Sequence, residues 1–266
     1  MKQLRTCAVQ VNISDYPEAI SEFLNGVAVY DSSCSKDAQV LFIDKDGGYY
    51  VKKAKNGTLK TESLMMEYMH SLGLSTEVLY YGSFKDNDYL LTARIPGEDC
   101  TDPKYLSDPK RLCDTTAMLL RTLHETAGSN CPVQDRTRSY ADTVIKGFDD
   151  RHYEPELLQG IWEFKSFDDA RRIAEEGLPL LKTDVLLHGD YCLPNIILDD
   201  WKFSGYIDLG YGGMGDRHID IFWGIWTLHF NLRTDKYTDR FIDAYGKELI
   251  DPEMLRIIAA MEAIGA

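Results

Sequence analysis

No pair of cysteines in this chain has the spacing that binds zinc or that staples a small secreted domain. The chain has six cysteines and no Cys-x-x-Cys pair, whereas zinc sites and disulfide frameworks depend on such regular spacing. The six are Cys7, Cys34, Cys100, Cys113, Cys131 and Cys192. We therefore expect neither a cysteine-based metal site nor a disulfide-stapled fold.

Long apolar segments are also missing. The N-terminus lacks the basic-then-apolar pattern of a secretory signal. The most apolar run, residues 219–232, is too short to span a bilayer and contains His229. These two absences predict a soluble, cytoplasmic protein with no membrane partner.

Positive charge is scarce. The chain has 29 Lys and Arg against 43 Asp and Glu, so its formal net charge is −14 and its pI is near 4.8. Nucleic acid and anionic membranes are therefore excluded as main partners, because both attract basic surfaces. Two explanations of the acidity stay open: it attracts a cationic ligand, or it only keeps the protein soluble.

A Walker A phosphate loop is absent as well, but residues 188–220 contain the groups of a different phosphoryl-transfer site. Phosphoryl transfer needs a carboxylate that accepts the proton of the attacking hydroxyl, and two oxygen ligands for Mg²⁺. Asp190, Asn195 and Asp208 supply these groups in the order and approximate spacing of a kinase. Acids and amides also gather in loops for turn geometry alone, but the complete pattern rarely arises by chance.

The motif HGDYCLPN, followed by IDLG, resembles the Brenner-type loop of aminoglycoside phosphotransferases, particularly the 3′-phosphotransferase branch. It is similar, more distantly, to choline kinases, macrolide kinases and eukaryotic protein kinases. The resemblance covers nearly the whole chain from about Gly26 and implies a bilobal, protein-kinase-like fold. It also implies an enzyme that phosphorylates a small-molecule hydroxyl with Mg²⁺ and ATP or GTP. Asp190 would be the catalytic base, and Asn195 and Asp208 the metal ligands.

Strand signals dominate up to residue 95 and helix signals dominate after it, which predicts an α+β fold rather than alternating βαβ units. The first part is expected to contain strands at 26–30, 38–44, 48–54, 77–84 and 89–95, and a helix at 58–72. Helices should follow at 109–127, 140–149, 167–181, 216–231, 237–246 and 252–264, with a β-ribbon at 196–198 and 203–207. Because Pro96-Gly97 breaks the pattern, we expect an N-terminal nucleotide-binding lobe at 1–95. The helical lobe at 96–266 would hold the catalytic loop and the acceptor site.

A kinase also needs a strand lysine for the phosphates and a helix glutamate that holds it. Lys52, in Tyr49-Tyr50-Val51-Lys52, and Glu62 resemble that pair. Lys53 is the fallback because neighbouring strand side chains point to opposite faces. Tyr50 matches the position of an aromatic residue stacked on adenine. The alternative is that these are ordinary surface charges and a plain strand tyrosine.

Two backbone segments would complete the nucleotide site. Residues 31–35 lie where kinases have a glycine-rich turn, and Ser35 is the best match to the serine that the resembling family uses there. Backbone N–H groups in such a turn can bind phosphate. By analogy, Ala93 and Ile95 would present backbone groups to the adenine edge.

His188 and Asp220 are expected to support the catalytic loop. The resemblance implies that Asp220 is buried and hydrogen-bonds the loop near His188. A simple acid at a helix terminus is the alternative.

Residues 210–215 match the dinucleotide fingerprint Gly-x-Gly-x-x-Gly. No second strand of a βαβ unit is expected after them, and the first glycine belongs to Asp-Leu-Gly. We therefore rank a dehydrogenase well below a kinase.

The acceptor pocket has the weakest signal. A polycationic aminoglycoside needs several carboxylates, and Glu163, after Trp162, and Glu262 resemble two that the family uses. Met261 stands where the family has a second C-terminal acid, and the helix after Phe222 lacks the acids expected beyond it. Acids between 149 and 156 would compensate, or would only solvate a loop.

The sequence as a whole predicts an ATP- or GTP-dependent kinase whose acceptor is a small, cationic molecule. The 3′-hydroxyl of an aminoglycoside is the leading candidate for the acceptor group. The alternatives are a kinase of another antibiotic, of choline or of a metabolite, and a non-catalytic kinase fold that binds nucleotide. The intact Asp190, Asn195 and Asp208 argue against the last. The sequence does not decide between ATP and GTP, or the oligomeric state.

Overall fold

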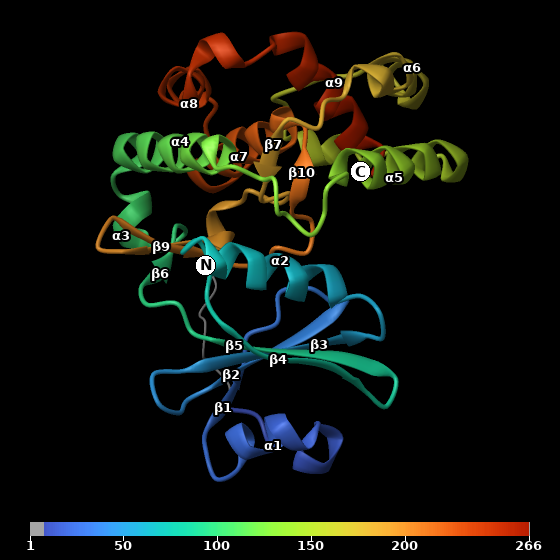
Figure 1. Ribbon diagram of the computed structural model, residues 1–266. Helices are drawn as coiled ribbons and strands as arrows, with labels where there is room; N and C mark the ends of the chain where they lie inside the picture. The colour runs from blue at the N-terminus through green and yellow to red at the C-terminus, as the bar shows by residue number, and fades with distance from the viewer. Residues whose placement is uncertain (1–7, 266) are drawn as a thin grey trace. The chain divides into compact units, whose positions relative to one another are not determined.

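The computed structural model describes residues 8–265 and divides the chain into two compact units (Figure 1). The first unit holds the described residues up to Gly97 together with Ser204–Gly210. The second holds Glu98–Phe203 and the described residues from Tyr211 onward. Cys7 lies outside the described residues, and the five described cysteines form no disulfides with one another.

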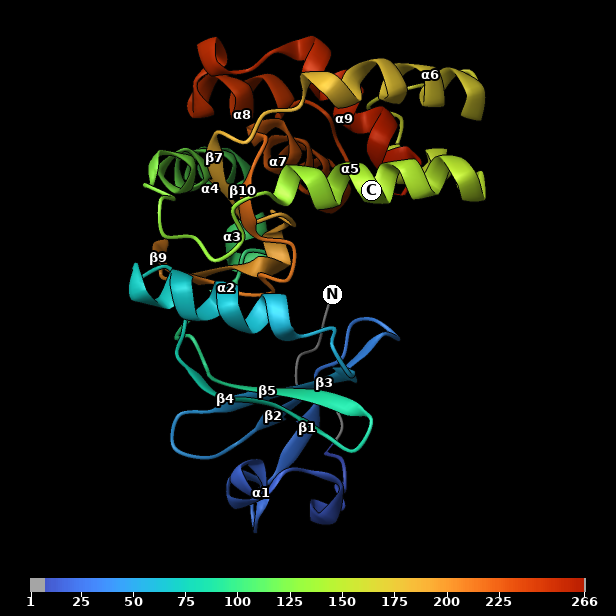
Figure 2. The ribbon, with the colours of Figure 1, turned by 45° about the vertical axis from the view of Figure 1, so that its right-hand side comes forward.

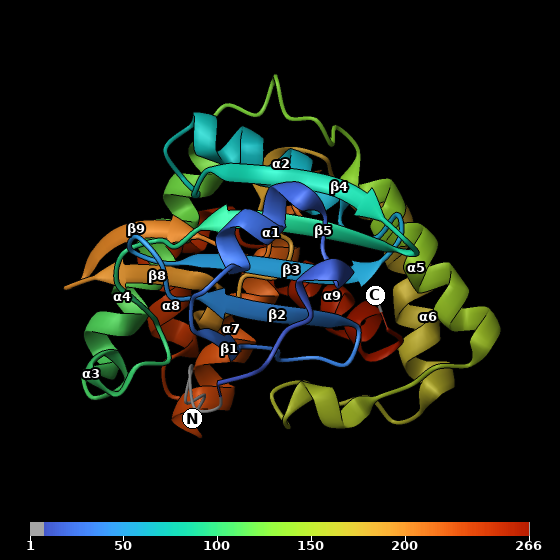
Figure 3. The same cartoon turned by 90° about the horizontal axis from the view of Figure 1, so that it is seen from below.

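A five-stranded antiparallel sheet is the centre of the first unit. Its strands are hydrogen-bonded in the order β1-β2-β3-β5-β4 (Figure 3). They are β1 (Val29–Asp31), β2 (Ala38–Ile43), β3 (Tyr49–Lys55), β4 (Val78–Phe84) and β5 (Asn87–Ala93). Asp46, Gly47 and Gly48 all have positive φ in the turn between β2 and β3. Glycine adopts that backbone conformation at little steric cost, which explains the Asp-Gly-Gly sequence of this hairpin.

Two helices lie on opposite faces of this sheet (Figure 2). The α1 face is apolar: Ile20 and Leu24 of α1 (Glu18–Leu24) belong to one buried cluster with Val51 of β3 and Tyr89 of β5. The short 3₁₀ helix η1 (Ile13–Asp15) precedes α1. The other face lies towards α2 (Lys60–Ser71). Because side chains alternate along β3, some lie in the apolar core on the α1 face and the others, which include polar groups, lie on the opposite face.

The second unit is mostly helical. Its α-helices are α3 (Pro103–Leu106), α4 (Pro109–Glu125), α5 (Arg136–Asp150), α6 (Phe167–Gly177), α7 (Arg217–Leu232), α8 (Thr238–Tyr245) and α9 (Pro252–Ala263). The 3₁₀ helices are η2 (Pro155–Leu158), η3 (Leu178–Leu180), η4 (Leu193–Asn195) and η5 (Lys247–Leu249). The short strand β7 (Val185–Leu187) pairs with β10 (Gly213–Gly215). A further sheet has the order β6 (Glu98–Asp99), β8 (Ile196–Asp199), β9 (Lys202–Tyr206).

Aspartates begin five of these helices. They are Asp102, Asp108, Asp135, Asp216 and Asp251, before α3, α4, α5, α7 and α9, and each carboxylate accepts a hydrogen bond from a backbone N–H of the first turn. Such caps satisfy N–H groups that have no partner inside the helix. The Asp135 cap also explains why α5 begins at Arg136, four residues before the predicted start.

The predicted α+β fold is confirmed, with five strands in one part and mostly helices in the other. Strand β5 covers 87–93 rather than 89–95, and α6 ends at Gly177 rather than at residue 181. The prediction missed α1, α3 and the short strands β6, β7 and β10. No helix among the described residues is long and apolar enough to cross a membrane.

Candidate active-site residues

Three charged residues of the first unit form an ion-pair cluster. The Lys52 Nζ lies 3.0 and 2.8 Å from the two Glu62 carboxylate oxygens and 2.7 Å from the Asp208 Oδ1. Glu62 stands in the first turn of α2. Lys53 points to the other face of β3, where its Nζ is 5.7 Å from the centre of the Tyr89 ring. The structure therefore brings Lys52, and not Lys53, to Glu62.

The electrostatics of this cluster favour a charged lysine. Burial works against the Lys52 ammonium, but the Glu62 and Asp208 carboxylates outweigh it, so the pKa of Lys52 lies above its ordinary value. Burial raises the pKa of Glu62, with Asp208 adding to the effect and Lys52 opposing it. Asp208 itself has a left-handed backbone, with φ of 61°, a conformation that is costly for a residue other than glycine.

In the second unit, Asp190 and Asn195 are held together. The Asn195 Nδ2 donates to the Asp190 backbone oxygen at 3.0 Å and to the Asp190 Oδ2 at 2.8 Å. Asn195 ends the single turn η4, and the Thr227 hydroxyl of α7 accepts from the Leu193 N–H at 3.1 Å. Because the Asn195 nitrogen is committed to Asp190, its amide oxygen is the atom that can act as an acceptor or a metal ligand.

Asp220 anchors the loop that carries Asp190. Its carboxylate is fully buried and accepts the backbone N–H groups of His188 and Gly189, each at 2.7 Å. Gly189 has φ of +86°, and a Cβ there would lie 1.9 Å from the Tyr211 backbone oxygen. Only glycine therefore fits at this point of the loop. The structure places Asp220 where the sequence analysis expected it, beside His188.

The sequence analysis missed His124 of α4 in this network. The His124 Nε2 lies 3.2 Å from the Asp220 Oδ2, and its Nδ1 lies 2.8 Å from the Tyr245 hydroxyl. His124 follows Leu120 and Leu123 on the buried side of α4. A histidine at an apolar position of a predicted helix was the signal that could have identified it.

The two acceptor candidates have different environments. Glu163 is exposed in the segment before α6, whereas Glu262 of α9 is 3% exposed and accepts the Tyr140 hydroxyl at 3.0 Å. Burial raises the pKa of Glu262 to about 8. The Asp190 charge adds to this rise, while Tyr140, Trp223 and Arg136 oppose it. Tyr140 and Trp223 were missed because nothing in their local sequence marks a partner on α9.

The nucleotide candidates in the first unit are spread over three segments. Ser35 is exposed in the connection between β1 and β2. In this connection the Ser33 hydroxyl accepts a hydrogen bond from the Val40 N–H at 2.9 Å. The Ala93 N–H donates to the Glu77 carbonyl at 3.2 Å, and its carbonyl accepts the Thr76 hydroxyl at 2.8 Å. Both backbone groups of Ala93 are therefore already engaged within the protein.

The other two nucleotide candidates are a buried and a half-buried side chain. Ile95 is 8% exposed and packs against Gly205, where an added Cβ would lie 2.8 Å from the Ile95 Cδ1. Within residues 8–265, the structure gives no protein acceptor for the Ile95 N–H. Tyr50 is half-buried, with its ring centre 5.2 Å from that of Phe42.

The glycine-rich segment 210–215 is not a dinucleotide site. Gly213, Met214 and Gly215 form β10, antiparallel to β7, rather than a turn that opens a helix. A Cβ on Gly213 would lie 2.7 Å from a Val133 methyl. Close packing explains that glycine, and the dehydrogenase alternative is rejected.

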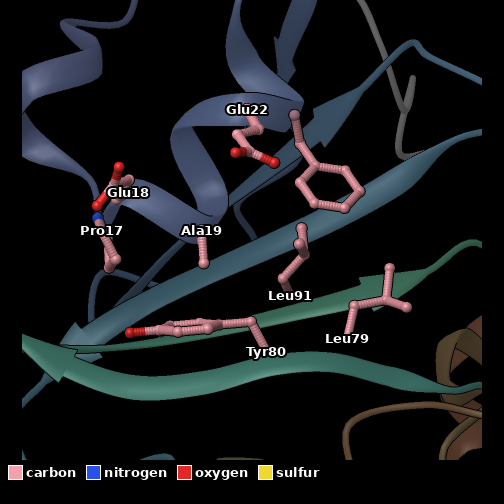
Figure 4. A pocket seen from close by; sticks show the side chains of 8 residues that line it. Pro17, Glu18, Ala19, Glu22, Leu79, Tyr80 and Leu91 are labelled. Carbon is pink, nitrogen blue, oxygen red and sulfur yellow. The ribbon is translucent and has the colours of Figure 1, made fainter.

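A shallow pocket of the first unit lies away from these residues. It sits between α1 and the strands β4 and β5, and Glu22, Leu79 and Tyr80 contribute to its lining (Figure 4). It opens on the α1 face of the sheet, whereas Lys52 reaches Glu62 on the α2 face. We therefore assign it no part in the chemistry.

Asp208 in the first unit offers a carboxylate oxygen, and Asn195 in the second unit offers an amide oxygen. Oxygen donors of these two types suit Mg²⁺. Among residues 8–265 no cluster of three or more His, Cys, Asp or Glu could hold a metal on its own. In phosphoryl-transfer enzymes, phosphates and waters usually supply the other ligands of Mg²⁺.

Solved structures show the fold of the chain. A type VIII aminoglycoside-3′-phosphotransferase superposes with a TM-score of 0.73 at 21% identity, covering 93% of this chain and 100% of that chain. An aminoglycoside phosphotransferase from Streptomyces rimosus, in complex with ADP and streptomycin, gives 0.68 at 21% identity, covering 85% and 90%. At these identities the comparison shows the fold, which is kinase-like.

Sequence relatives show the family. The model of the phosphotransferase enzyme family matches residues 31–258. A probable aminoglycoside 3′-phosphotransferase of Lactococcus lactis subsp. lactis (strain IL1403) is 44% identical over 265 residues, 100% of this chain and 99% of that protein. An aminoglycoside 3′-phosphotransferase of Niallia circulans is 27% identical over 199 residues, 75% of this chain and 76% of that protein. The chain belongs to the phosphotransferase enzyme family, which confirms the predicted enzyme class.

Proposed function

We propose that this enzyme transfers the γ-phosphoryl group of ATP to the 3′-hydroxyl of an aminoglycoside. One observation carries the proposal: the Asp190 carboxylate is held by Asn195 on a loop that Asp220 anchors. The names of the sequence relatives described above support the acceptor, since one is a probable aminoglycoside 3′-phosphotransferase and the other an aminoglycoside 3′-phosphotransferase. The enzyme would act in the cytoplasm, and ATP would be its phosphoryl donor.

Lys52, Glu62 and Asp208 would handle the donor. The ADP and AMP-PNP complexes of structural relatives support a nucleotide ligand. Lys52 stays charged at neutral pH and is aimed by Glu62, so its ammonium can hold phosphate oxygens. Its ion pair with Asp208 would then loosen, which frees that carboxylate for metal binding. Mg²⁺, held by Asp208 and Asn195, would neutralise charge across the phosphates.

The remaining donor contacts would come from the first unit. Tyr50 would stack on the adenine, and the Ile95 N–H and the Ala93 carbonyl would bond its edge. For Ala93 this uses the second lone pair of a carbonyl that already accepts from Thr76. The turn that contains Ser35 would cover the phosphates.

Asp190 would act as the base. The acceptor hydroxyl oxygen forms a bond to the γ-phosphorus while the bond from that phosphorus to the β,γ-bridging oxygen breaks, and the hydroxyl proton passes to Asp190. Asn195 occupies the Asp190 Oδ2, which leaves Oδ1 for the hydroxyl. His188 and Asp220 would hold the loop in place, and Glu163 and Glu262 would bind acceptor ammonium groups.

The direct test is a product assay. The purified protein would be incubated with Mg²⁺ and ATP, or GTP, together with a panel of aminoglycosides, and the products would be analysed by mass spectrometry. We expect one added phosphoryl group on aminoglycosides with a free 3′-hydroxyl and none on a 3′-deoxy analogue. Phosphorylation of the 3′-deoxy analogue would reject the 3′ position. Turnover only on a neutral alcohol would reject the aminoglycoside while leaving the kinase chemistry intact.

A further inference from the structure

Asp88, the second residue of β5, carries a fully buried carboxylate that the proposed chemistry does not use. Its exposed fraction is 0%. Burial of such a group is costly unless hydrogen bonds compensate for the lost water. Two backbone N–H groups and two hydroxyls donate to the Asp88 carboxylate. The positions of these four donors indicate what the carboxylate holds in place.

Two of the donors belong to the connection between β3 and α2. The Asp88 Oδ2 accepts the backbone N–H of Gly57 at 2.9 Å and that of Leu59 at 3.1 Å. Leu59 directly precedes α2, and its apolar side chain makes no capping hydrogen bond. The Leu59 carbonyl in turn accepts the Ser63 N–H at 3.0 Å, within the first turn of α2. Asp88 therefore anchors the start of α2 from a neighbouring strand, and its negative charge suits that end of the helix.

The other two donors fix the Asp88 carboxylate itself. The Ser83 hydroxyl donates to Oδ1 at 2.8 Å, and the Tyr81 hydroxyl donates to Oδ2 at 3.3 Å. Both residues lie on β4. Because β4 restrains the carboxylate from a second strand, it forms a fixed attachment point for the β3–α2 connection.

That connection joins the two partners of the Lys52–Glu62 ion pair. Lys52 lies on β3 before the connection, and Glu62 lies in the first turn of α2, three residues after Leu59. Asp88 pairs with Ala54 across the sheet, and Ala54 is two residues from Lys52. Because strand side chains alternate, Asp88 and Lys52 lie on the same face of the sheet. A shift of the first turn of α2 would move Glu62 away from the Lys52 ammonium, which it now contacts at 3.0 and 2.8 Å.

We propose that Asp88 is a positioning residue for the nucleotide site. It holds the start of α2 so that Glu62 keeps Lys52 directed at the phosphates of the donor. This inference rests on the proposed role of Lys52. Asp88 acts through the β3–α2 connection and the ion pair, so its loss should weaken the binding of the donor rather than that of the acceptor.

The first measurement is a titration of the full-length protein with Mg²⁺-ATP in the absence of acceptor. Asp88→Ala should raise the Kd for Mg²⁺-ATP by about tenfold, the scale of a lost hydrogen bond to a charged group. Asp88→Asn keeps one carbonyl oxygen for the Gly57 and Leu59 N–H groups, so it should raise the Kd by only about threefold. The acceptor KM of either variant should stay within about twofold of the wild type, since uniform loss of donor binding leaves acceptor binding intact.

A double-mutant cycle with Lys52→Ala separates positioning from a general effect on the fold. If Asp88 acts through Lys52, adding Asp88→Ala to Lys52→Ala should raise the Kd by less than about twofold further, because coupled residues are not additive. If Asp88→Ala does not fold, Asp88→Asn replaces it. The threefold effect of Asp88→Asn should then disappear in the Lys52→Ala background.

Leu24→Ala is the matched control for stability. Leu24 is 3% exposed and lies in the apolar cluster on the α1 face of the same sheet. Its truncation should destabilise the first unit in thermal unfolding but should change the Kd for Mg²⁺-ATP by less than about twofold, since Leu24 lies outside the Asp88 network.

The outcomes separate this inference from the proposed function. If Lys52→Ala weakens Mg²⁺-ATP binding but the Asp88 variants bind like the wild type, Asp88 has no positioning role. The same conclusion follows if the effect of Asp88 is undiminished in the Lys52→Ala background, or if Leu24→Ala weakens binding as much. If Lys52→Ala binds Mg²⁺-ATP as tightly as the wild type, the proposed role of Lys52 fails, and the inference about Asp88 fails with it.

Discussion

Glu62 in the first unit and Glu262 in the second are both buried carboxyls, but their partners differ. Both oxygens of Glu62 contact the Lys52 ammonium, at 3.0 and 2.8 Å, whereas Glu262 accepts from the neutral Tyr140 hydroxyl at 3.0 Å. Burial raises the pKa of each, and that of Glu262 reaches about 8. Glu62 therefore belongs to a cluster of paired charges, whereas Glu262 is held by hydrogen bonds from neutral groups.

The largest expected effect separates chemistry from donor binding. Asp190→Ala should lower kcat by roughly 10² to 10⁴, the usual contribution of a general base, and should leave the nucleotide Kd almost unchanged. Lys52→Ala should instead weaken nucleotide binding, with Lys53→Ala as the control because Lys53 points to the other face of β3. Steady-state kinetics and nucleotide titration measure both. Full activity of Asp190→Ala would mean that the assignment of this loop is wrong.

Asp208 and Asp220 provide a second contrast. Asp220→Ala should lower the free energy of unfolding by roughly 2–5 kcal/mol, because two buried N–H groups lose their acceptor. Asp220→Asn keeps one carbonyl acceptor and should lose less. Asp208→Ala should keep the fold, since its side chain is 50% exposed, but should abolish the Mg²⁺-dependent tightening of ATP binding. Urea unfolding and titrations with and without Mg²⁺ distinguish them. Normal Mg²⁺ coupling in Asp208→Ala would contradict its role as a ligand.

The raised pKa of Glu262 predicts a pH-dependent stability. Between pH 4.5, which equals the ordinary pKa of a glutamate, and about pH 8, the folded protein keeps a proton on Glu262 that the unfolded chain releases. The stability contribution of Glu262 therefore falls as pH rises through that window. Glu262→Gln should equal the wild type near pH 4.5 and exceed it by a few kcal/mol at pH 8, if the amide keeps the bond from Tyr140. Urea unfolding across pH tests this, and a constant difference between the two proteins would refute it.

The smallest expected effect concerns the exposed candidate. Glu163→Gln should raise the acceptor KM by only about two- to fivefold, because an exposed ion pair is weak and screened by salt. Glu262→Gln should raise it more only as the pH reaches about 8, because the native carboxyl carries a proton below that pH. Measuring KM at low and high salt compares the two. An equal, salt-independent effect of both variants would remove the contrast between them.

Local sequence was enough to predict the long elements and the motif residues. The Asp-Gly-Gly turn, the apolar periodicity of α4 and the spacing of Asp190, Asn195 and Asp208 are all short-range signals. The short strands were not predicted, because strands of two or three residues, such as β7 and β10, form only by pairing with a strand that is distant in the sequence. The start of α5 was missed because the Asp135 cap was overlooked, although it is visible in the sequence.

By itself, the sequence determined the strand-then-helix order, the candidate base and metal ligands, and the choice of a phosphotransferase, because each depends on neighbouring residues or fixed spacing. Only the tertiary structure decided that Lys52 rather than Lys53 meets Glu62 and that His124 joins Asp220. It also decided that Tyr140 and Trp223 close around Glu262. These contacts join residues that are far apart in the chain, or choose between two faces of a strand. Burial then changes the protonation of Glu262, which no local pattern records.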